Sequence, residues 1–140
     1  DYPVVRSEKK FFEVVREVTN GEGCPVVYEA IGKETMQESL DCLRPMGICA
    51  AYGHVSGPPE PVDIIKDLGQ RGSLFITRPA IMHYVAKRSD LEFTANGLFN
   101  AISAGILDAN INYEYPLKEA VKAHEAIESG KTIGATVLLP

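Results

Sequence analysis

The stretch VVYEAIGKETMQESLDCLRPMGICAAYGHVSG, residues Val26–Gly57, decides the fold class. It begins with a β-branched and aromatic run, Val26–Tyr28, that has no helical period. Apolar residues at helical spacing follow, then a turn at Arg44–Gly47 and a second apolar run at Ile48–Tyr52. Near-continuous apolar strands are typical of a parallel sheet covered by helices. The stretch therefore predicts two neighbouring parallel strands joined by a helix.

A glycine turn follows each of these two predicted strands. Ile31-Gly32 follows the first strand, and Gly53–Gly57 follows the second. In parallel α/β sheets, ligands bind outside the carboxyl ends of the strands. Both turns are therefore predicted to lie at a ligand-binding edge.

The rest of the chain is predicted to alternate between helices and strands. Strand and helix in alternation predict an α/β fold with right-handed crossovers for residues 1–79, and the pattern changes after Pro79. Ser7 and the Ser89–Glu92 capping box are the predicted helix starts. The predicted helices cover residues 7–19, 36–43, 62–68, 89–104 and 117–127, and the further strands cover residues 72–77, 111–115 and 136–139.

Composition excludes several classes of function. The chain has 140 residues, 45% of them hydrophobic, and a net charge of −5, which disfavours a nucleic-acid surface. No apolar run approaches the ~20 residues of a membrane span. Three cysteines and three histidines show no metal-ligand spacing, so we expect no metal and a reducing, cytoplasmic location. We expect Cys42 and Cys49 to be buried small hydrophobes, and His124 to be a hydrogen-bonded core histidine.

Four motifs carry a resemblance to a known family. They are VVYEAIG (Val26–Gly32), SLDCLRPMGICAAYGHVSG (Ser39–Gly57), GSLFITRP (Gly72–Pro79) and the ending YPLKEAVKAHEAIESGKTIGATVLLP (Tyr115–Pro140). In this order the chain resembles the C-terminal portion of the quinone oxidoreductase (zeta-crystallin-like) branch of the medium-chain dehydrogenase/reductase superfamily. The resemblance covers essentially the whole chain, and the chain corresponds to well under half of a family member.

The resemblance implies a zinc-independent enzyme that uses NADPH to transfer hydride to quinones or related enones. It implies that residues 1–79 are the second half of a Rossmann-type cofactor domain, with a parallel sheet and flanking helices. It implies that residues 80–140 are the C-terminal segment returning to a GroES-like catalytic domain. It also implies a homodimer, paired through the edge of the Gly72–Thr77 strand.

The GxGxxG turn that holds the pyrophosphate of a dinucleotide is absent from this sequence. We therefore expect this turn upstream of Asp1, and we expect the chain to be a piece of a longer protein. The chain alone is expected to be inactive. An unpaired edge along Val26–Glu29 and one uncovered sheet face are also expected.

The resemblance implies cofactor contacts at a set of strand ends and loops. Alternative interpretations stay open: a strand-end tyrosine for Tyr2, a tight turn for Gly32, an ion-pair partner for Arg78 and a solvated lysine for Lys131. The implied residues are Tyr2, Ile31, Gly32, Gly53, His54, Val55, Ser56, Ile76, Thr77, Arg78, Pro79 and Lys131.

No catalytic residue is assigned from the sequence. Hydride transfer to a quinone needs no dedicated protein base, because the cofactor carries the chemistry. A position of His54 beside the cofactor or in solvent is therefore favoured over a general-acid role. Two other functions stay open: a non-catalytic assembly module that pairs through the flat edge of residues 72–77, and a fragment of an enoyl reductase of the same superfamily.

Overall fold

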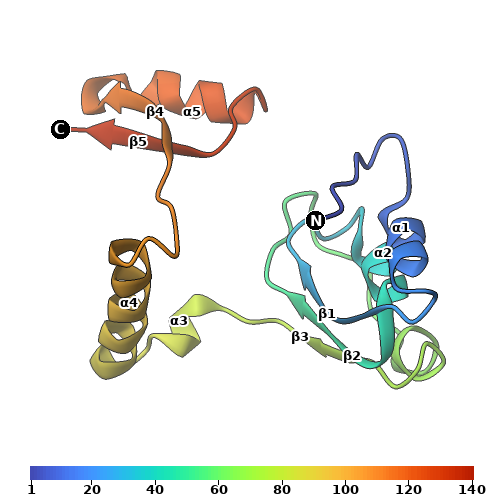
Figure 1. Ribbon diagram of the computed structural model, residues 1–140. Helices are drawn as coiled ribbons and strands as arrows, with labels where there is room; N and C mark the ends of the chain where they lie inside the picture. Colours follow the sequence, from blue (N-terminus) through green and yellow to red (C-terminus); the bar gives the residue numbers. More distant parts are fainter. The chain divides into compact units, whose positions relative to one another are not determined.

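The computed structural model describes all residues from Asp1 to Pro140. They form two compact units, Asp1–Tyr84 and Val85–Pro140 (Figure 1). The assignment of residues 1–79 to a cofactor domain and of residues 80–140 to a catalytic domain stays a prediction.

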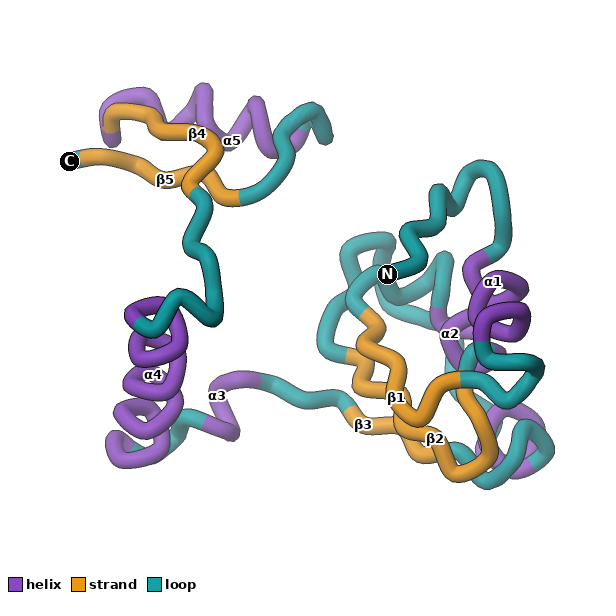
Figure 2. The backbone as a smooth tube through the Cα atoms, in the orientation of Figure 1, coloured by secondary structure: helices purple, strands orange, loops and turns teal.

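The first unit is built on three parallel strands in the order β1-β2-β3, which Figure 2 shows in orange. The parallel sheet with connecting helices confirms the predicted α/β class. In chain order the elements are α1 (Phe11–Val18), β1 (Cys24–Glu29), α2 (Met36–Asp41), β2 (Leu43–Ala51), the π-helical segment η1 (Ile64–Gly69), β3 (Phe75–Thr77) and α3 (Ile81–Tyr84).

One face of this sheet is packed, and it holds the core. Figure 1 shows α1 and α2 on the same side of the strands. The side chains of α2 meet inward-facing strand residues, and removing each large buried side chain from water contributes about 1.5–3 kcal/mol. The core residues are Met36, Leu40, Leu43, Cys49, Ala51 and Leu74, with Val27, Leu68 and Ile76 packed against them.

The opposite face of the sheet is open. Val26 pairs with Ile48, and Ile48 pairs with Phe75, so these residues share that face. Their exposed fractions are 40%, 41% and 59%, and Tyr28 on the same face is 75% exposed. This agrees with the expected uncovered face.

The boundary between α2 and β2 differs from the predicted one. The helix ends at Asp41, and Leu43 is the first residue of β2 instead of the last apolar position of the helix. The predicted turn at residues 44–47 lies inside β2, where Met46 has a φ of 59°. The pairing with β1 shifts there, from Leu43 to Ile48. The turn residues therefore form an irregularity in a strand, which a linear pattern does not distinguish from a helix stop.

Neither predicted helix cap is observed. The helix α1 begins at Phe11, and Ser7 lies in a preceding turn closed by the hydrogen bond from Glu8 N to Val5 O. The helix α4 begins at Arg88, and no side chain caps it. Its Glu92 carboxylate accepts a hydrogen bond from Arg88 Nε at 2.6 Å instead. Ser89 and Glu92 thus bond to neighbouring side chains instead of to the helix end, so their spacing alone does not fix the start.

The second unit consists of one long helix and a small parallel pair of strands covered by a helix. Strands β4 and β5 are parallel. The elements are α4 (Arg88–Ser103), β4 (Ile111–Pro116), the 3-10 turn η2 (Leu117–Glu119), α5 (Ala120–Glu128) and β5 (Ala135–Leu139).

The histidine of α5 is exposed, so its predicted place in the core was wrong. Ala123 is the buried residue of this helix, and His124 beside it faces outward. Only two short strands lie under α5, so Ala123 is the only residue of this helix that they bury. No helix of the chain is both long and apolar enough to cross a membrane.

Candidate functional site

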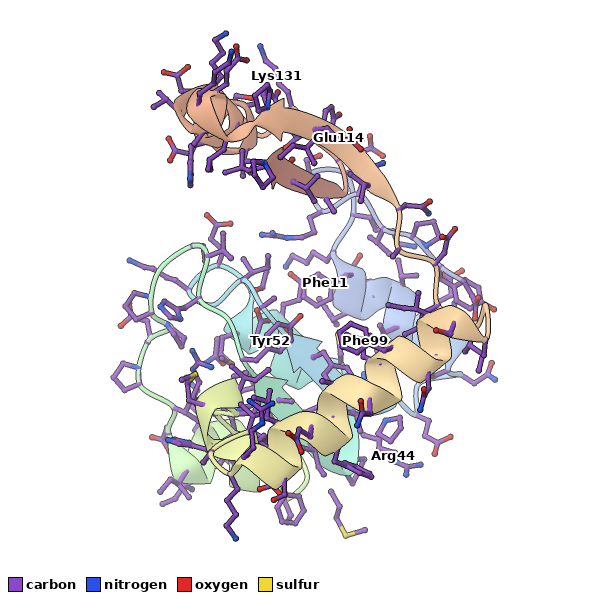
Figure 3. The ribbon with its side chains drawn as sticks, turned by 90° about the vertical axis from the view of Figure 1, so that its left-hand side faces the viewer. Phe11, Arg44, Tyr52, Phe99, Glu114 and Lys131 are labelled. Atoms are coloured by element: carbon purple, nitrogen blue, oxygen red, sulfur yellow. The ribbon has the colours of Figure 1, made fainter.

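The three strands of the first unit end together at their carboxyl edge. Glu29 pairs with Ala51, and Ala50 pairs with Thr77, so the strand ends are in register. The segments that follow the strands are residues 30–32, 52–57 and 78–79, which we call the rim. Figure 3 labels Tyr52, the first rim residue after β2.

The first two rim segments are joined through main-chain hydrogen bonds. Tyr52 N and Gly53 N donate to Glu29 O at 2.9 and 3.2 Å. Ser56 donates to Ile31 O twice, through its amide at 2.8 Å and through its hydroxyl at 2.8 Å. The segments after β1 and β2 therefore form one hydrogen-bonded layer.

Close packing between these two segments explains two of the three rim glycines, Gly32 and Gly53. Gly32 has a φ of +93°, which agrees with the tight-turn interpretation, and a Cβ there would lie 2.5 Å from Gly57 O. A Cβ on Gly53 would lie 2.2 Å from Ala30 O. The backbone of Ala30 therefore lies against Gly53, and a cofactor contact at Gly53 stays a prediction.

Arg78 connects the ends of β2 and β3. Its Nη1 donates to Tyr52 O at 2.7 Å and to Pro79 O at 3.0 Å. Its Nη2 lies 3.4 Å from Nδ1 of His54. These partners are two carbonyl oxygens and an imidazole, not the carboxylate of the ion-pair interpretation. Arg78 thus fixes the third rim segment against the second.

Two cavities open at the rim, and Arg78 lines both. They hold about 200 and 310 Å³. The smaller is lined by Met36, Ala51, Gly53, His54, Pro58, Pro59 and Arg78. The larger is lined by Thr77, Arg78, Pro79, Ala80, His83 and Tyr84. This edge is the candidate ligand site of the first unit.

A buried carboxylate lies under the rim, and sequence reasoning missed it. Glu29 is 3% exposed. Burial by itself raises the pKa of Glu29, but hydrogen bonds from Ser39, Gly32, Thr35 and Ile31 outweigh it, so the pKa is lowered from its ordinary value of 4.5. The available signal was an acidic residue at the end of an apolar strand, directly before a glycine turn.

The structure brings most of the predicted site residues to one edge. Tyr2 is 66% exposed, and no hydrogen bond joins it to the rim. Lys131, labelled in Figure 3, lies in the second unit between α5 and β5. Binding roles of these two residues stay predictions. The residues gathered at the edge are Ile31, Gly32, Gly53, His54, Val55, Ser56, Ile76, Thr77, Arg78 and Pro79.

The two buried thiols are not activated as nucleophiles. Burial raises the pKa of Cys42 to about 12 and that of Cys49 to about 11. Since the thiolate is the nucleophilic form, neither side chain is an activated nucleophile. Both are buried, which confirms their prediction as small hydrophobes.

Solved structures that match this fold include quinone oxidoreductases. The chain superimposes on a crystal structure of Escherichia coli quinone oxidoreductase complexed with NADPH, with a TM-score of 0.89 and 36% identity. The match covers 98% of this chain and 42% of that one. The parallel sheet and helices described above are thus those of the quinone oxidoreductase fold.

Sequence comparison gives the family. Residues 2–138 match the family model described as zinc-binding dehydrogenase, and the chain belongs to this family. It is 53% identical over 134 residues to a 2-haloacrylate reductase of Burkholderia sp, covering 96% of this chain and 40% of that protein. It is 39% identical over 135 residues to a quinone oxidoreductase of Salmonella typhimurium, and the match covers 95% of this chain and 41% of that protein. The chain therefore spans well under half the length of these relatives.

The family description mentions zinc, but the side chains of this chain do not form a zinc site. No three His, Cys, Asp or Glu side chains of the chain gather where they could hold a metal ion. A zinc site needs three or four such ligands. The residues present do not fit a zinc ion, and no step is assigned to one.

Proposed function

We propose that the protein containing residues 1–140 is an NADPH-dependent oxidoreductase that transfers hydride to quinones or related enones. The observation that carries this proposal is the rim, where three parallel strand ends meet and Arg78 joins two of them. Ligands bind at this edge of α/β sheets. The relatives named quinone oxidoreductase and 2-haloacrylate reductase support the same reaction class.

The rim is assigned the nicotinamide half of NADPH. When bound, the cofactor would supply the hydride that reduces a quinone or an electron-poor carbon, and solvent would supply the accompanying proton. The segments 53–56 and 76–79 orient the nicotinamide, and Ile31-Gly32 lies beside the cofactor. Tyr2 contacts the adenosine end, and Lys131 adds positive charge. The hydrogen bonds within the rim keep these segments fixed before the cofactor arrives.

The acceptor class is tested by kinetics on the complete gene product. The absorbance of NADPH is followed with 1,4-benzoquinone and with 2-chloroacrylate as separate acceptors, and NADH serves as the cofactor control. We expect NADPH consumption with at least one acceptor. A folded protein that consumes NADPH with neither would contradict the proposed reaction.

Residues 1–140 alone are proposed to lack activity, because they contain no GxGxxG turn to hold the pyrophosphate. NADPH titrations compare this chain with the complete gene product. We expect binding only by the complete product. Micromolar affinity of the 140-residue chain would refute the proposal.

An assembly role has one observation in its favour. Strand β3 is an edge of the sheet, and its Phe75 is 59% exposed. Exposed edge strands pair readily with copies of themselves. We propose a homodimer through this edge, which is compatible with the enzymatic function.

A further inference from the structure

Glu29 ends β1 and directs its carboxylate into the first unit. Its Oε1 accepts hydrogen bonds from the amides of Ile31 at 2.6 Å and Gly32 at 2.9 Å. The same oxygen accepts a third hydrogen bond from Thr35 Oγ1 at 2.9 Å. Its Oε2 accepts a hydrogen bond from the hydroxyl of Ser39. Oε1 therefore bonds the rim turn and Thr35 at the start of α2, and Oε2 bonds Ser39 within α2.

The carboxylate has no cationic partner, because all four of its recorded partners are neutral N–H or O–H donors. A buried charge is costly unless hydrogen bonds replace its hydration. Hydrogen bonds to an ionised acceptor are about twice as strong as neutral ones. The donors therefore both stabilise the charge and are held by it, and two of them are the rim amides.

The main chain of the same residue reaches the second rim segment. Its carbonyl oxygen accepts from Tyr52 N and Gly53 N, at 2.9 and 3.2 Å. Glu29 is therefore the one residue bonded to the rim segments after both β1 and β2. The carboxylate supplies the bonds to the first segment, and the main-chain carbonyl supplies those to the second.

We propose that Glu29 is a positioning residue for NADPH: its buried carboxylate fixes the Ile31-Gly32 turn, and its carbonyl fixes the start of the Tyr52–Gly57 segment, so that the rim is preformed for the cofactor. This inference rests on the proposed function. Glu29 touches neither cofactor nor substrate, and it acts through the turn that it holds.

The test uses the complete gene product with four substitutions. Glu29→Ala removes the carboxylate, and Glu29→Asp keeps the charge but withdraws it from the turn. Glu29→Gln keeps one oxygen facing the turn, while its amide nitrogen donates to Ser39, whose hydroxyl can accept. Ser39→Ala is the matched control, because it removes a hydrogen bond to Oε2 and leaves the turn bonds in place.

The dissociation constant of NADPH and kcat at saturating NADPH are both measured. We expect Glu29→Asp and Glu29→Ala to raise the dissociation constant about tenfold or more, since buried amides lose their acceptor. Glu29→Gln and Ser39→Ala are expected to stay within about threefold of the wild type. Amide hydrogen exchange at residues 31 and 32 is expected to speed up only in the first two. If Glu29→Ala does not fold, Glu29→Asp still supplies the comparison.

Two results would overturn the inference. One is wild-type NADPH affinity in Glu29→Asp. The other is a lower kcat with an unchanged dissociation constant, because a purely structural role lowers the active fraction and leaves affinity alone. If the wild type itself binds no NADPH, the proposed function is wrong. If the wild type binds NADPH and Glu29→Asp binds it equally well, only the role of Glu29 is wrong.

Discussion

Two glycines at the rim lie where the neighbouring segment leaves no room for a side chain. The tighter position is Gly53, where a Cβ would meet Ala30 O at 2.2 Å. Gly97 in α4 is the opposite case, because nothing lies within 4 Å of a Cβ there. The same substitution should therefore have opposite effects at these two glycines.

Gly53→Ala is expected to lower the free energy of unfolding by about 1–3 kcal/mol, because the backbone must shift to admit the methyl group. It should also weaken NADPH binding by separating the first two rim segments. Gly97→Ala is expected to raise the free energy of unfolding by up to ~1 kcal/mol, through helix propensity. Denaturant unfolding and NADPH titration check both. Equal stability of the two variants would contradict the packing of Gly53 against Ala30.

The lowered pKa of Glu29 predicts a pH dependence of stability. A carboxyl group whose folded pKa lies below its ordinary 4.5 stabilises the fold above that value, and this contribution is lost as the pH falls through the folded pKa. Unfolding of the wild type and Glu29→Gln is compared between neutral and acidic pH. The variant is expected to lose less stability on acidification. Asp67, whose pKa is also lowered, is present in both proteins, so the difference reports Glu29. An equal loss of stability on acidification in the wild type and in Glu29→Gln would contradict the lowered pKa of Glu29.

At the scale of elements, hydrophobic pattern predicted which segments are strands and which are helices. The parallel order and the glycine turns at the strand ends followed from residues 26–57 and 72–77, because both depend on local sequence. Leu43 was misplaced because an apolar residue at helical spacing also suits a buried strand start. His124 was misplaced because its burial depends on how much sheet lies under α5. Glu29 was missed because its partners are brought together only by the fold.

Helix capping gives an element-scale test. Asp63 accepts from Ile65 N and Lys66 N, both at 2.8 Å, at the start of η1. Asp63→Ala is expected to lower the free energy of unfolding by about 1 kcal/mol. Ser7→Ala is the control and should change it little, because Ser7 caps no helix. Denaturant unfolding measures the free energy of unfolding of both variants. A larger decrease in Ser7→Ala than in Asp63→Ala would contradict the observed start of α1.

At the scale of the whole molecule, the open edge of β3 predicts self-association. Phe75→Lys places a charge on this edge, and charged edge residues oppose strand pairing. We expect the sedimentation mass to fall from dimer to monomer. Ile64→Lys is the control, because Ile64 is 76% exposed but lies on η1. A dimer that survives Phe75→Lys would place the interface elsewhere.

The proposed function depends most on the rim holding the nicotinamide half of NADPH. Hydrogen exchange of the complete gene product, measured with and without NADPH, tests it directly. We expect the cofactor to slow exchange in residues 31–32, 53–56 and 76–79 together. Cofactor-dependent protection that spares all three segments would contradict it.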